Sequence, residues 1–255
     1  MFDFVSRIPL FLLSLPVVLL ALSVHETAHG YVAYKLGDPT AYSLGRLTVN
    51  PLKHIDPIGL LCMVVFRIGW AKPVPINTRY FKKPKRDMAL SAAAGPVSNL
   101  LLALLFAGLL RLLVLLVDVF FAEELVTLLP SLLGATTPVP ASIKLLSVLA
   151  YILYMGVILN TSLAIFNLIP IPPFDGSRIA HVFLPTKWYF AIMKYEQIIM
   201  IVLLVIFFLF PSSWLSDATT WLSSGFLRLF GMHGDREASL ELNTMLIYVA
   251  QSLSF

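Results

Sequence analysis

The apolar stretch from Ile8 to Lys35 reads IPLFLLSLPVVLLALSVHETAHGYVAYK and carries the charged motif His25-Glu26-Thr27-Ala28-His29 near its end. A helix needs about 20 apolar residues to cross the hydrocarbon core of a bilayer, and this stretch is long enough. Ionisable side chains within such a span are costly and are normally kept for a function. The stretch therefore predicts a membrane-spanning helix with a chemical site in it.

The composition of the whole chain also indicates a membrane protein. Of its 255 residues, 58% are hydrophobic and 13% are charged, against about 45–50% and 25% in soluble domains. Two further apolar runs, Met88 to about Val117 and Leu145 to about Ile169, are long enough to span a bilayer. A fourth run, Gln197 to Phe210, is shorter and needs flanking residues to complete a span.

The first and second spans are separated by a segment of different character. Ile58 to Phe66 is too short to cross and predicts a re-entrant piece. Gly45–Pro51 and Lys72–Asn77 carry β-branched residues bounded by Gly and Pro, which favours short strands. We therefore expect an all-α polytopic membrane protein with about four main transmembrane helices plus short re-entrant or β segments.

Two parts of the chain are expected. Residues 1–210 form a membrane-embedded core, and residues 211–255 form an amphipathic C-terminal tail. The run from Pro9 to Leu22 resembles the apolar part of a signal peptide, but it continues into the histidine motif, which cleavage would separate from its anchor. We expect a retained helix.

Cys62 is the only cysteine, so no intramolecular disulfide can form.

Charge predicts the orientation of the spans. The loop from Lys35 to Arg86 carries most of the basic residues, whereas the connection from Asp118 to Lys144 is mainly acidic. Basic loops face the cytoplasm, so we expect a multi-pass protein of the cell membrane with both termini outside. The basic run Arg79–Arg86 sits between apolar segments, which favours a membrane anchor over a nucleic-acid site. His29 lies about 31 Å along the first helix, towards its cytoplasmic end.

His25 and His29 stand four residues apart, so a helix places both on one face. Two imidazoles so placed can bind one zinc ion, with each nitrogen at about 2.0–2.1 Å. Glu26 can take a proton from an attacking water and return it to the leaving amine. In a soluble chain two surface histidines flanking a glutamate would explain the pattern as well, but a position inside a span favours zinc.

A catalytic zinc ion usually has three protein ligands and one open position. Asp175 stands out because it follows the third span beyond a proline-rich turn, on the same predicted side of the membrane as His29. The alternative is that Asp175 only caps a helix beginning near Ser177. Besides the other carboxylates, the remaining candidates are His54, His181 and His233.

Asn160 and Asn167 lie seven residues apart and therefore share one face of the third span. Such amides either hydrogen-bond between helices or place a donor near the metal that stabilises the developing oxyanion. Asn167 is the better candidate for the second role, since it is closer in sequence to Asp175.

Together these motifs resemble the site-2 protease family of intramembrane zinc metalloproteases. The resemblance covers roughly residues 20 to 185, and compact members without a PDZ or CBS domain are the nearest match. It rests on His25-Glu26-x-x-His29, Asn167-x-x-Pro170-x-Pro172-x-x-Asp175-Gly176, Ala94-Gly95-Pro96-x-x-Asn99, Gly45-Arg46-Leu47-Thr48-x-Asn50-Pro51 and Gly69-Trp70-Ala71-Lys72-Pro73-Val74.

The resemblance implies a role for each site residue. His25, His29 and Asp175 would bind one Zn²⁺ per chain, Glu26 would be the general base, and Asn167 would line the site. His54 lies in a segment that resembles the compact members. It would be a fourth metal ligand, a group that supports the ligands, or a plain interfacial histidine.

The implied activity is that of a hydrolase, a zinc metalloendopeptidase that cuts peptide bonds within or near transmembrane segments. Its partners would be the lipid bilayer and a membrane-protein substrate with a transmembrane helix. We expect an extended substrate to pair with a strand edge at Gly45–Asn50 or Val74–Asn77.

Two other functions compete with this one. A metal or solute transporter could use the intramembrane histidines to handle a moving ion. A different membrane zincin, which clips soluble or prenylated substrates, would take a glutamate from a later helix instead of Asp175.

Overall fold

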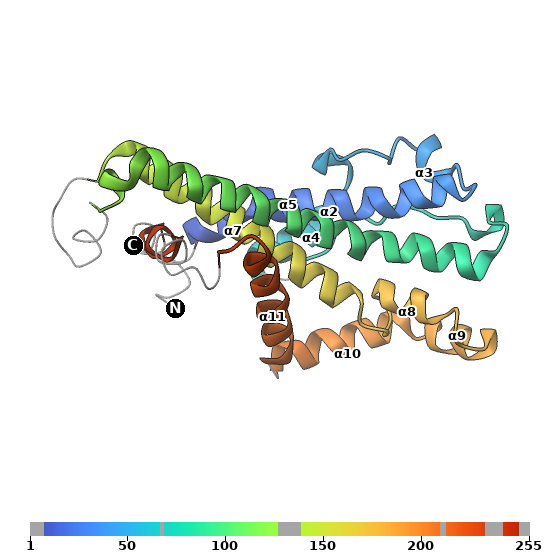
Figure 1. Ribbon diagram of the computed structural model, residues 1–255. Helices are drawn as coiled ribbons and strands as arrows, with labels where there is room; N and C mark the ends of the chain where they lie inside the picture. Colours follow the sequence, from blue (N-terminus) through green and yellow to red (C-terminus); the bar gives the residue numbers. More distant parts are fainter. Residues whose placement is uncertain (1–7, 67–68, 127–138, 210–212, 233–241, 250–255) are drawn as a thin grey trace. The chain divides into compact units, whose positions relative to one another are not determined.

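A computed structural model describes residues 8–66, 69–126, 139–209, 213–232 and 242–249. Figure 1 shows helices joined by turns and loops. Within these ranges no strand forms, and a single antiparallel bridge joins Ile55 to Ala71. The expected all-α fold is confirmed.

Three helices in the described ranges are long and apolar enough to cross a bilayer. The first and third end close to where the apolar runs end, and α5 begins at Pro84, because proline is favoured in the first turn of a helix. Helix α5 is interrupted at Phe121, where φ is −135° and ψ is 17°. The three are α2 (Ile8–Lys35), α5 (Pro84–Val126) and α7 (Ala141–Asn167).

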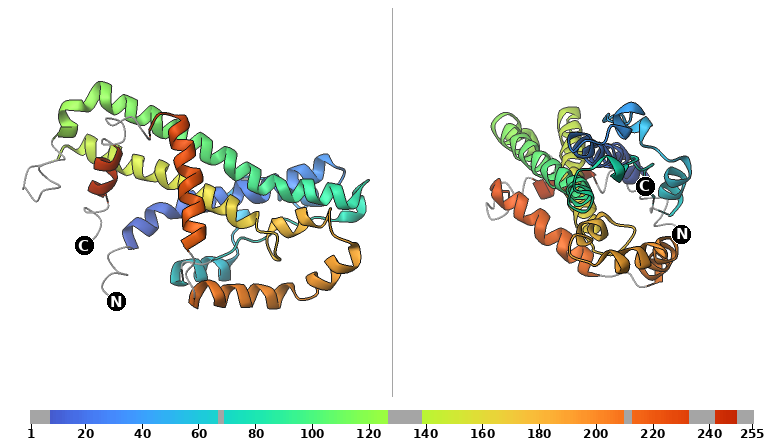
Figure 2. Two further views of the ribbon diagram at one scale, coloured as in Figure 1. Left: turned by 60° about the horizontal axis from the view of Figure 1, so that its bottom comes forward. Right: turned by 90° about the vertical axis from the view of Figure 1, so that its right-hand side faces the viewer.

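The other helices are shorter, and Figure 2 shows α8, α9 and α10 as separate helices in series. Helix α10 has 14 residues, or about 21 Å, which is less than a bilayer core of about 30 Å. The fourth span therefore stays a prediction. The shorter helices are α3 (Thr40–Ser43), α4 (Pro57–Phe66), α8 (Asp175–Ala180), α9 (Thr186–Met193), α10 (Glu196–Leu209) and α11 (Ser213–Leu229), with 3-10 turns at Pro51–Lys53 and Thr78–Tyr80 and a further helix at residues 242–249.

The prediction of short strands at Gly45–Pro51 and Lys72–Asn77 is wrong. Pro73 and Pro75 have no N–H to donate to a strand ladder. Side chains bind the extended backbone instead: Arg46 Nη2 donates to the carbonyl of Lys72 at 2.8 Å, and Thr27 Oγ1 donates to the carbonyl of Thr48 at 2.6 Å. We call Lys72–Asn77 the strap, because it lies extended without a partner strand.

The chain divides into two compact units. One consists of residues up to Val18, Leu102–Leu159 and residues from Thr220 on, and its core is apolar. The other consists of Leu19–Leu101 and Asn160–Thr219. Most of the buried polar side chains belong to this second unit, among them His25, His29, Asp38, His54, Asn99 and Asn160. Buried polar groups need partners, so this unit is where a chemical site is to be sought.

Large apolar side chains on the long helices face outward. On α5 the exposed fractions are 63% for Leu101, 57% for Leu105 and 52% for Leu112. A soluble domain rarely exposes apolar patches of this kind, whereas a bilayer solvates them. The chain is a multi-pass membrane protein.

Candidate active site

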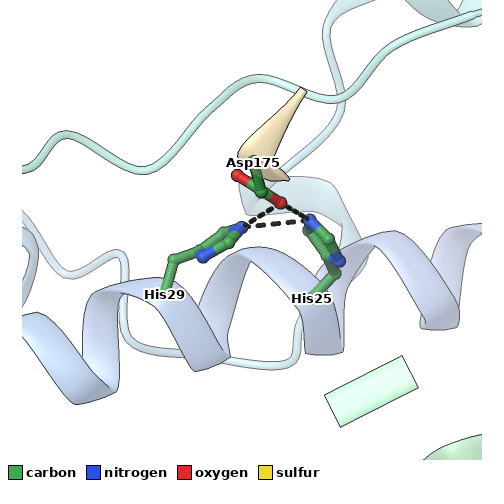
Figure 3. Close-up of side chains that lie close together, drawn as sticks. All are labelled: His25, His29 and Asp175. Atoms are coloured by element: carbon green, nitrogen blue, oxygen red, sulfur yellow. Dashed lines mark hydrogen bonds and ion pairs between the residues drawn. The ribbon is translucent and has the colours of Figure 1, made fainter. Parts of the chain in front are cut away.

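His25 and His29 point to one side of α2, as their spacing predicts (Figure 3). Their rings meet edge to face with centroids 4.5 Å apart, and their Nε2 atoms are 3.0 Å apart. Both side chains are buried. The helix therefore presents two imidazole nitrogens to one point in a protein interior.

The other ring nitrogen of each histidine is held by an oxygen. His25 Nδ1 lies 2.5 Å from Oδ1 of Asn99, and His29 Nδ1 lies 2.8 Å from the carbonyl oxygen of Ser91. Both partners belong to α5. Carbonyl oxygens only accept, so both Nδ1 atoms carry a proton, and in the neutral form of each ring Nε2 keeps the lone pair. That is the tautomer in which Nε2 can bind a metal.

Asp175 completes the cluster from another part of the chain (Figure 3). Helix α7 ends at Asn167, and α8 begins at Asp175 with Phe174 at its N-cap position, so Asp175 is not the cap of this helix. A Cβ at Gly176 would lie 2.6 Å from the carbonyl carbon of Leu168. Glycine there lets α8 pack directly against the turn that follows α7, which brings Asp175 to the histidines.

The Asp175 carboxylate lies with Oδ2 at 3.1 Å from His25 Nε2 and 3.2 Å from His29 Nε2. Burial raises the pKa of this carboxyl, but hydrogen bonds and charge from His25 and His29, when those rings carry a proton on Nε2, lower it by more, so the net pKa lies well below its usual range. The carboxylate is therefore ionised at neutral pH.

These three groups fit a metal ion. Ligands about 2.0 Å from a tetrahedral ion lie about 3.3 Å from one another, and the three ligand atoms here are 3.0–3.2 Å apart. Oδ2 of Asp175 is buried with no hydrogen-bond donor, since both Nε2 atoms present lone pairs. Three converging lone pairs suit a cation, and two imidazoles with one carboxylate suit Zn²⁺ with one position open.

Glu26 lies beside the cluster without belonging to it. Its Oε2 accepts a hydrogen bond from the backbone N–H of Val74 at 2.8 Å. Because Pro73 and Pro75 have no N–H, this is the one backbone donor that the middle of the strap can offer. A Cβ at Gly30 would lie 2.9 Å from Cγ1 of Val74, so glycine there lets the strap lie against α2.

The family follows from comparison with known proteins. A sequence profile of peptidase family M50 matches residues 13–210. The chain belongs to peptidase family M50.

Relatives of this M50 chain carry matching names. It is 39% identical over 190 residues to "Putative zinc metalloprotease YwhC" of Bacillus subtilis, a match that covers 74% of this chain and 77% of YwhC. It is 33% identical over 112 residues to the protein named Rip2 in Mycolicibacterium smegmatis, over 42% of each chain. With Rip2 of Mycobacterium tuberculosis it shares 26% identity over 80% of this chain and 70% of Rip2.

No solved structure gives a significant match to this M50 chain. The family and the relatives' names support a zinc metalloprotease, with Zn²⁺ as its metal, and nothing in them favours a transporter. The resemblance to site-2 proteases is thereby confirmed.

The two asparagines of α7 in this M50 chain have different surroundings. Asn160 is fully buried, and its Oδ1 accepts a hydrogen bond from Asn99 Nδ2 at 2.9 Å. Asn167 is at the end of α7, where its Nδ2 donates to the carbonyl of Leu163 at 3.0 Å. Its catalytic role stays a prediction.

The other candidate histidines do not join the metal cluster among the described residues. His54 is buried, and its Nε2 donates to the carbonyl of Thr48 at 2.7 Å. His181 is also buried, and burial together with the charge of Lys85 lowers its pKa. His233 lies outside the described residues.

Several residues of the M50 site received no role from sequence reasoning. Asn99 bonds to His25 and the Val74 N–H to Glu26, and a Cβ at Gly95 would meet both histidines. The motif Ala94-Gly95-Pro96-x-x-Asn99 and the Pro73-Val74-Pro75 pattern were visible signals for them. Ser91 acts through a backbone carbonyl, which no side-chain pattern reveals.

Proposed function

We propose that this chain cuts membrane proteins within or near their transmembrane segments, at a zinc centre that faces the cytoplasm. The observation that carries the proposal is the convergence of His25, His29 and Asp175 beside Glu26, on a helix apolar enough to span a bilayer. Hydrolysis of a peptide bond needs an electrophilic centre and a base in contact with one water, and this arrangement supplies both.

The proposed roles follow from the positions of the side chains. His25, His29 and Asp175 hold the ion, which when bound polarises the scissile carbonyl and lowers the pKa of water to about 7. Glu26 accepts the proton of the attacking water and delivers it to the leaving amine. The Val74 N–H keeps the Glu26 carboxylate directed to this point. Asn167 donates its second amide N–H to the developing oxyanion.

The strap limits where the substrate can pair. Three strap N–H groups are already bonded: that of Lys72 to the carbonyl of His54, that of Val74 to Glu26 and that of Asn77 to Asp38. The two strap prolines have no N–H. Five of its six residues therefore offer no free N–H to a substrate strand. In Gly45–Asn50 the N–H groups of Gly45, Arg46 and Asn50 are also used, but those of residues 47–49 make no bond within the described residues. We propose that this segment is the edge with which an unwound substrate pairs, since Val49 is 56% exposed there.

The proposed activity is tested by one substitution and its control. Glu26→Gln removes the base and keeps the ligands, so it should retain one zinc per chain while uncut membrane proteins accumulate in the proteome of cells that carry it. Glu123→Gln, the same change at an exposed position of α5, should retain zinc and cleavage. Weaker zinc binding by Glu26→Gln with no uncut protein would overturn the proposal and favour transport.

The proposed orientation rests on the basic loop between the first two spans. In a Cys62→Ser background, we expect Tyr42→Cys to react with a membrane-impermeant maleimide only after the cells are broken. Tyr42 is 61% exposed, so access to the side chain does not limit the reaction. Glu123→Cys should react in intact cells. The reverse pattern would place the site on the outer side.

The extent of the protease core is also a proposal. We assign the catalytic core to residues 1–210 and treat residues 211–255 as an appended amphipathic tail. The end of the family match at residue 210 supports this boundary. A chain that ends at 210 should keep zinc binding if the assignment is right, and loss of zinc from a folded truncated chain would contradict it.

A further inference from the structure

A chain of hydrogen bonds leads from α7 through α5 to the first zinc ligand. Asn160 Oδ1 accepts from Asn99 Nδ2 at 2.9 Å, and Asn99 Oδ1 lies 2.5 Å from His25 Nδ1. Asn99 and Asn160 have no solvent exposure, and His25 has 4%. All three residues belong to the same compact unit. The protein thus joins three helices by a polar contact that ends on the metal centre.

The orientation of the Asn99 amide decides which tautomer of His25 this series of hydrogen bonds stabilises. Nδ2 of Asn99 lies 3.2 Å from the carbonyl oxygen of Ala21, which can only accept a hydrogen bond. The second N–H of Nδ2 is directed at Asn160 Oδ1. With both donors used in this way, the Asn99 oxygen must face His25, and Nδ1 of His25 must carry its proton. A rotated amide would offer donors to Nδ1 and favour the wrong tautomer.

We propose that Asn99 and Asn160 are positioning residues of the zinc centre, which together fix His25 in the tautomer that binds metal. Asn99 acts on the ligand directly, and Asn160 acts at one remove by fixing the Asn99 amide. This inference rests on the zinc centre of the proposed function. The competing interpretation is that the two amides only hold the helices together, as polar residues in membrane helices often do.

The two interpretations differ in what the loss of Asn160 does to zinc binding. Removing a group that orients a metal-bound histidine typically lowers metal affinity about 10–100-fold. Asn160→Leu should therefore weaken zinc binding about 10-fold, and Asn99→Leu, which removes the direct contact, by more. Asn160→Asp keeps an oxygen that can accept from Asn99 Nδ2, so it should bind zinc more tightly than Asn160→Leu.

The test measures the zinc dissociation constant of the full chain in detergent, by competition with a chromophoric chelator. Thr161→Val is the matched control. Thr161 is the next residue of α7, it is also fully buried, and its Oγ1 has no hydrogen-bond partner among the described residues. It should leave the zinc dissociation constant unchanged. If Asn160→Leu does not fold, Asn160→Ala removes the amide without adding volume.

A second measurement reports the tautomer without zinc. In the metal-free chain with ¹⁵N-labelled histidine, the His25 Nδ1 signal should be that of a protonated nitrogen in wild type, Asn160→Asp and Thr161→Val. In Asn160→Ala it should become a mixture of both tautomers. Zinc affinity and tautomer unchanged in a folded Asn160→Ala variant would overturn the positioning role.

The positioning role and the protease activity can fail separately. A chain that binds zinc with this pattern of affinities but cuts no membrane protein would overturn the proposed function and support the positioning residues. A chain that cuts, and whose zinc affinity does not depend on Asn160, would overturn the positioning role alone.

Discussion

A side chain at Gly95 of α5 would collide with both histidines of the proposed zinc centre, and Gly95→Ala is therefore expected to damage the site severely. A Cβ at this position would lie 2.5 Å from Nε2 of His29 and 2.6 Å from Cε1 of His25. Ordinary van der Waals contact begins at about 3.4 Å, so each ring must move by roughly 1 Å. Neither ring can do so freely, since Ser91 and Asn99 hold their Nδ1 atoms.

The size of the effect follows from the tolerance of a metal site. Ligand distances are kept within about 0.2 Å, and the required displacement is several times larger. We expect the zinc affinity of Gly95→Ala to fall by at least about 100-fold, the upper end of the effect of losing one orienting group. Cleavage should be lost with the metal.

The assay is again chelator competition on the detergent-solubilised chain, with cleavage followed in parallel. Gly108→Ala is the control, because it makes the same change in the same helix and its Cβ would meet only the ring edge of Phe230 at 3.3 Å. It should bind zinc like wild type. A Gly95→Ala variant that binds one zinc within about twofold of wild-type affinity would refute the steric reasoning.

Three other outcomes are expected. Asp175→Ala should lower bound zinc well below one ion per chain in metal analysis, and full zinc content would show that another group is the third ligand. Val74→Pro removes the N–H that binds Glu26, and a hydrogen bond to a charged group is worth about 1.5–3 kcal/mol, so kcat/KM should fall about 10–100-fold with zinc retained. Val74→Ala keeps the N–H and should have a kcat/KM near that of wild type. A faster Val74→Pro variant would mean that the contact restrains the base. Removal of zinc by a chelator should lower the melting temperature of wild type, because three buried lone pairs then face one another, and the same treatment of Asp175→Ala should shift it less.

Sequence reasoning predicted the parts of the site that are set by local geometry. The spacing of His25 and His29 fixes their common face on any helix, and the length of the apolar runs fixes the spans. The proline-rich turn before Asp175 ends α7 wherever the rest of the chain lies. Each of these conclusions depends on a few neighbouring residues, so no tertiary information was needed.

The strand prediction at Lys72–Asn77 was wrong because it rested on β propensity and did not count the backbone N–H donors. A segment with prolines at positions 73 and 75 has too few N–H groups to form a ladder. The donors that remain are taken by side chains from other segments, such as Asp38, whose Oδ2 accepts from Asn77 N–H at 2.7 Å. The sequence contained the prolines, but it could not reveal that Glu26 and Asp38 would be within reach.

The groups that orient the two histidines could not be predicted either, because they are distant from them in sequence. Asn99 is 74 residues from His25 in sequence, and Ser91 is 62 residues from His29. Their roles depend on how α5 packs beside α2, which requires Gly95 at the point of contact. A small residue between two polar partners on one helix is a pattern that could have suggested this packing.

The site also explains how a membrane helix can hold so many polar groups. Each ionisable side chain of the motif on α2 is bound by a group outside that helix. Asn99 and Ser91 of α5 bind His25 and His29, and the Val74 N–H of the strap binds Glu26. Because these partners bond inward, the cost of burying the motif is offset within one compact unit, and the outer faces of the helices stay apolar. At the point where the two Nε2 atoms meet Asp175, Oδ2 of Asp175 has no hydrogen-bond partner within the described residues. A metal ion can accept a lone pair from all three groups at that point, so the packing that makes the helix tolerable in a bilayer also prepares it for zinc.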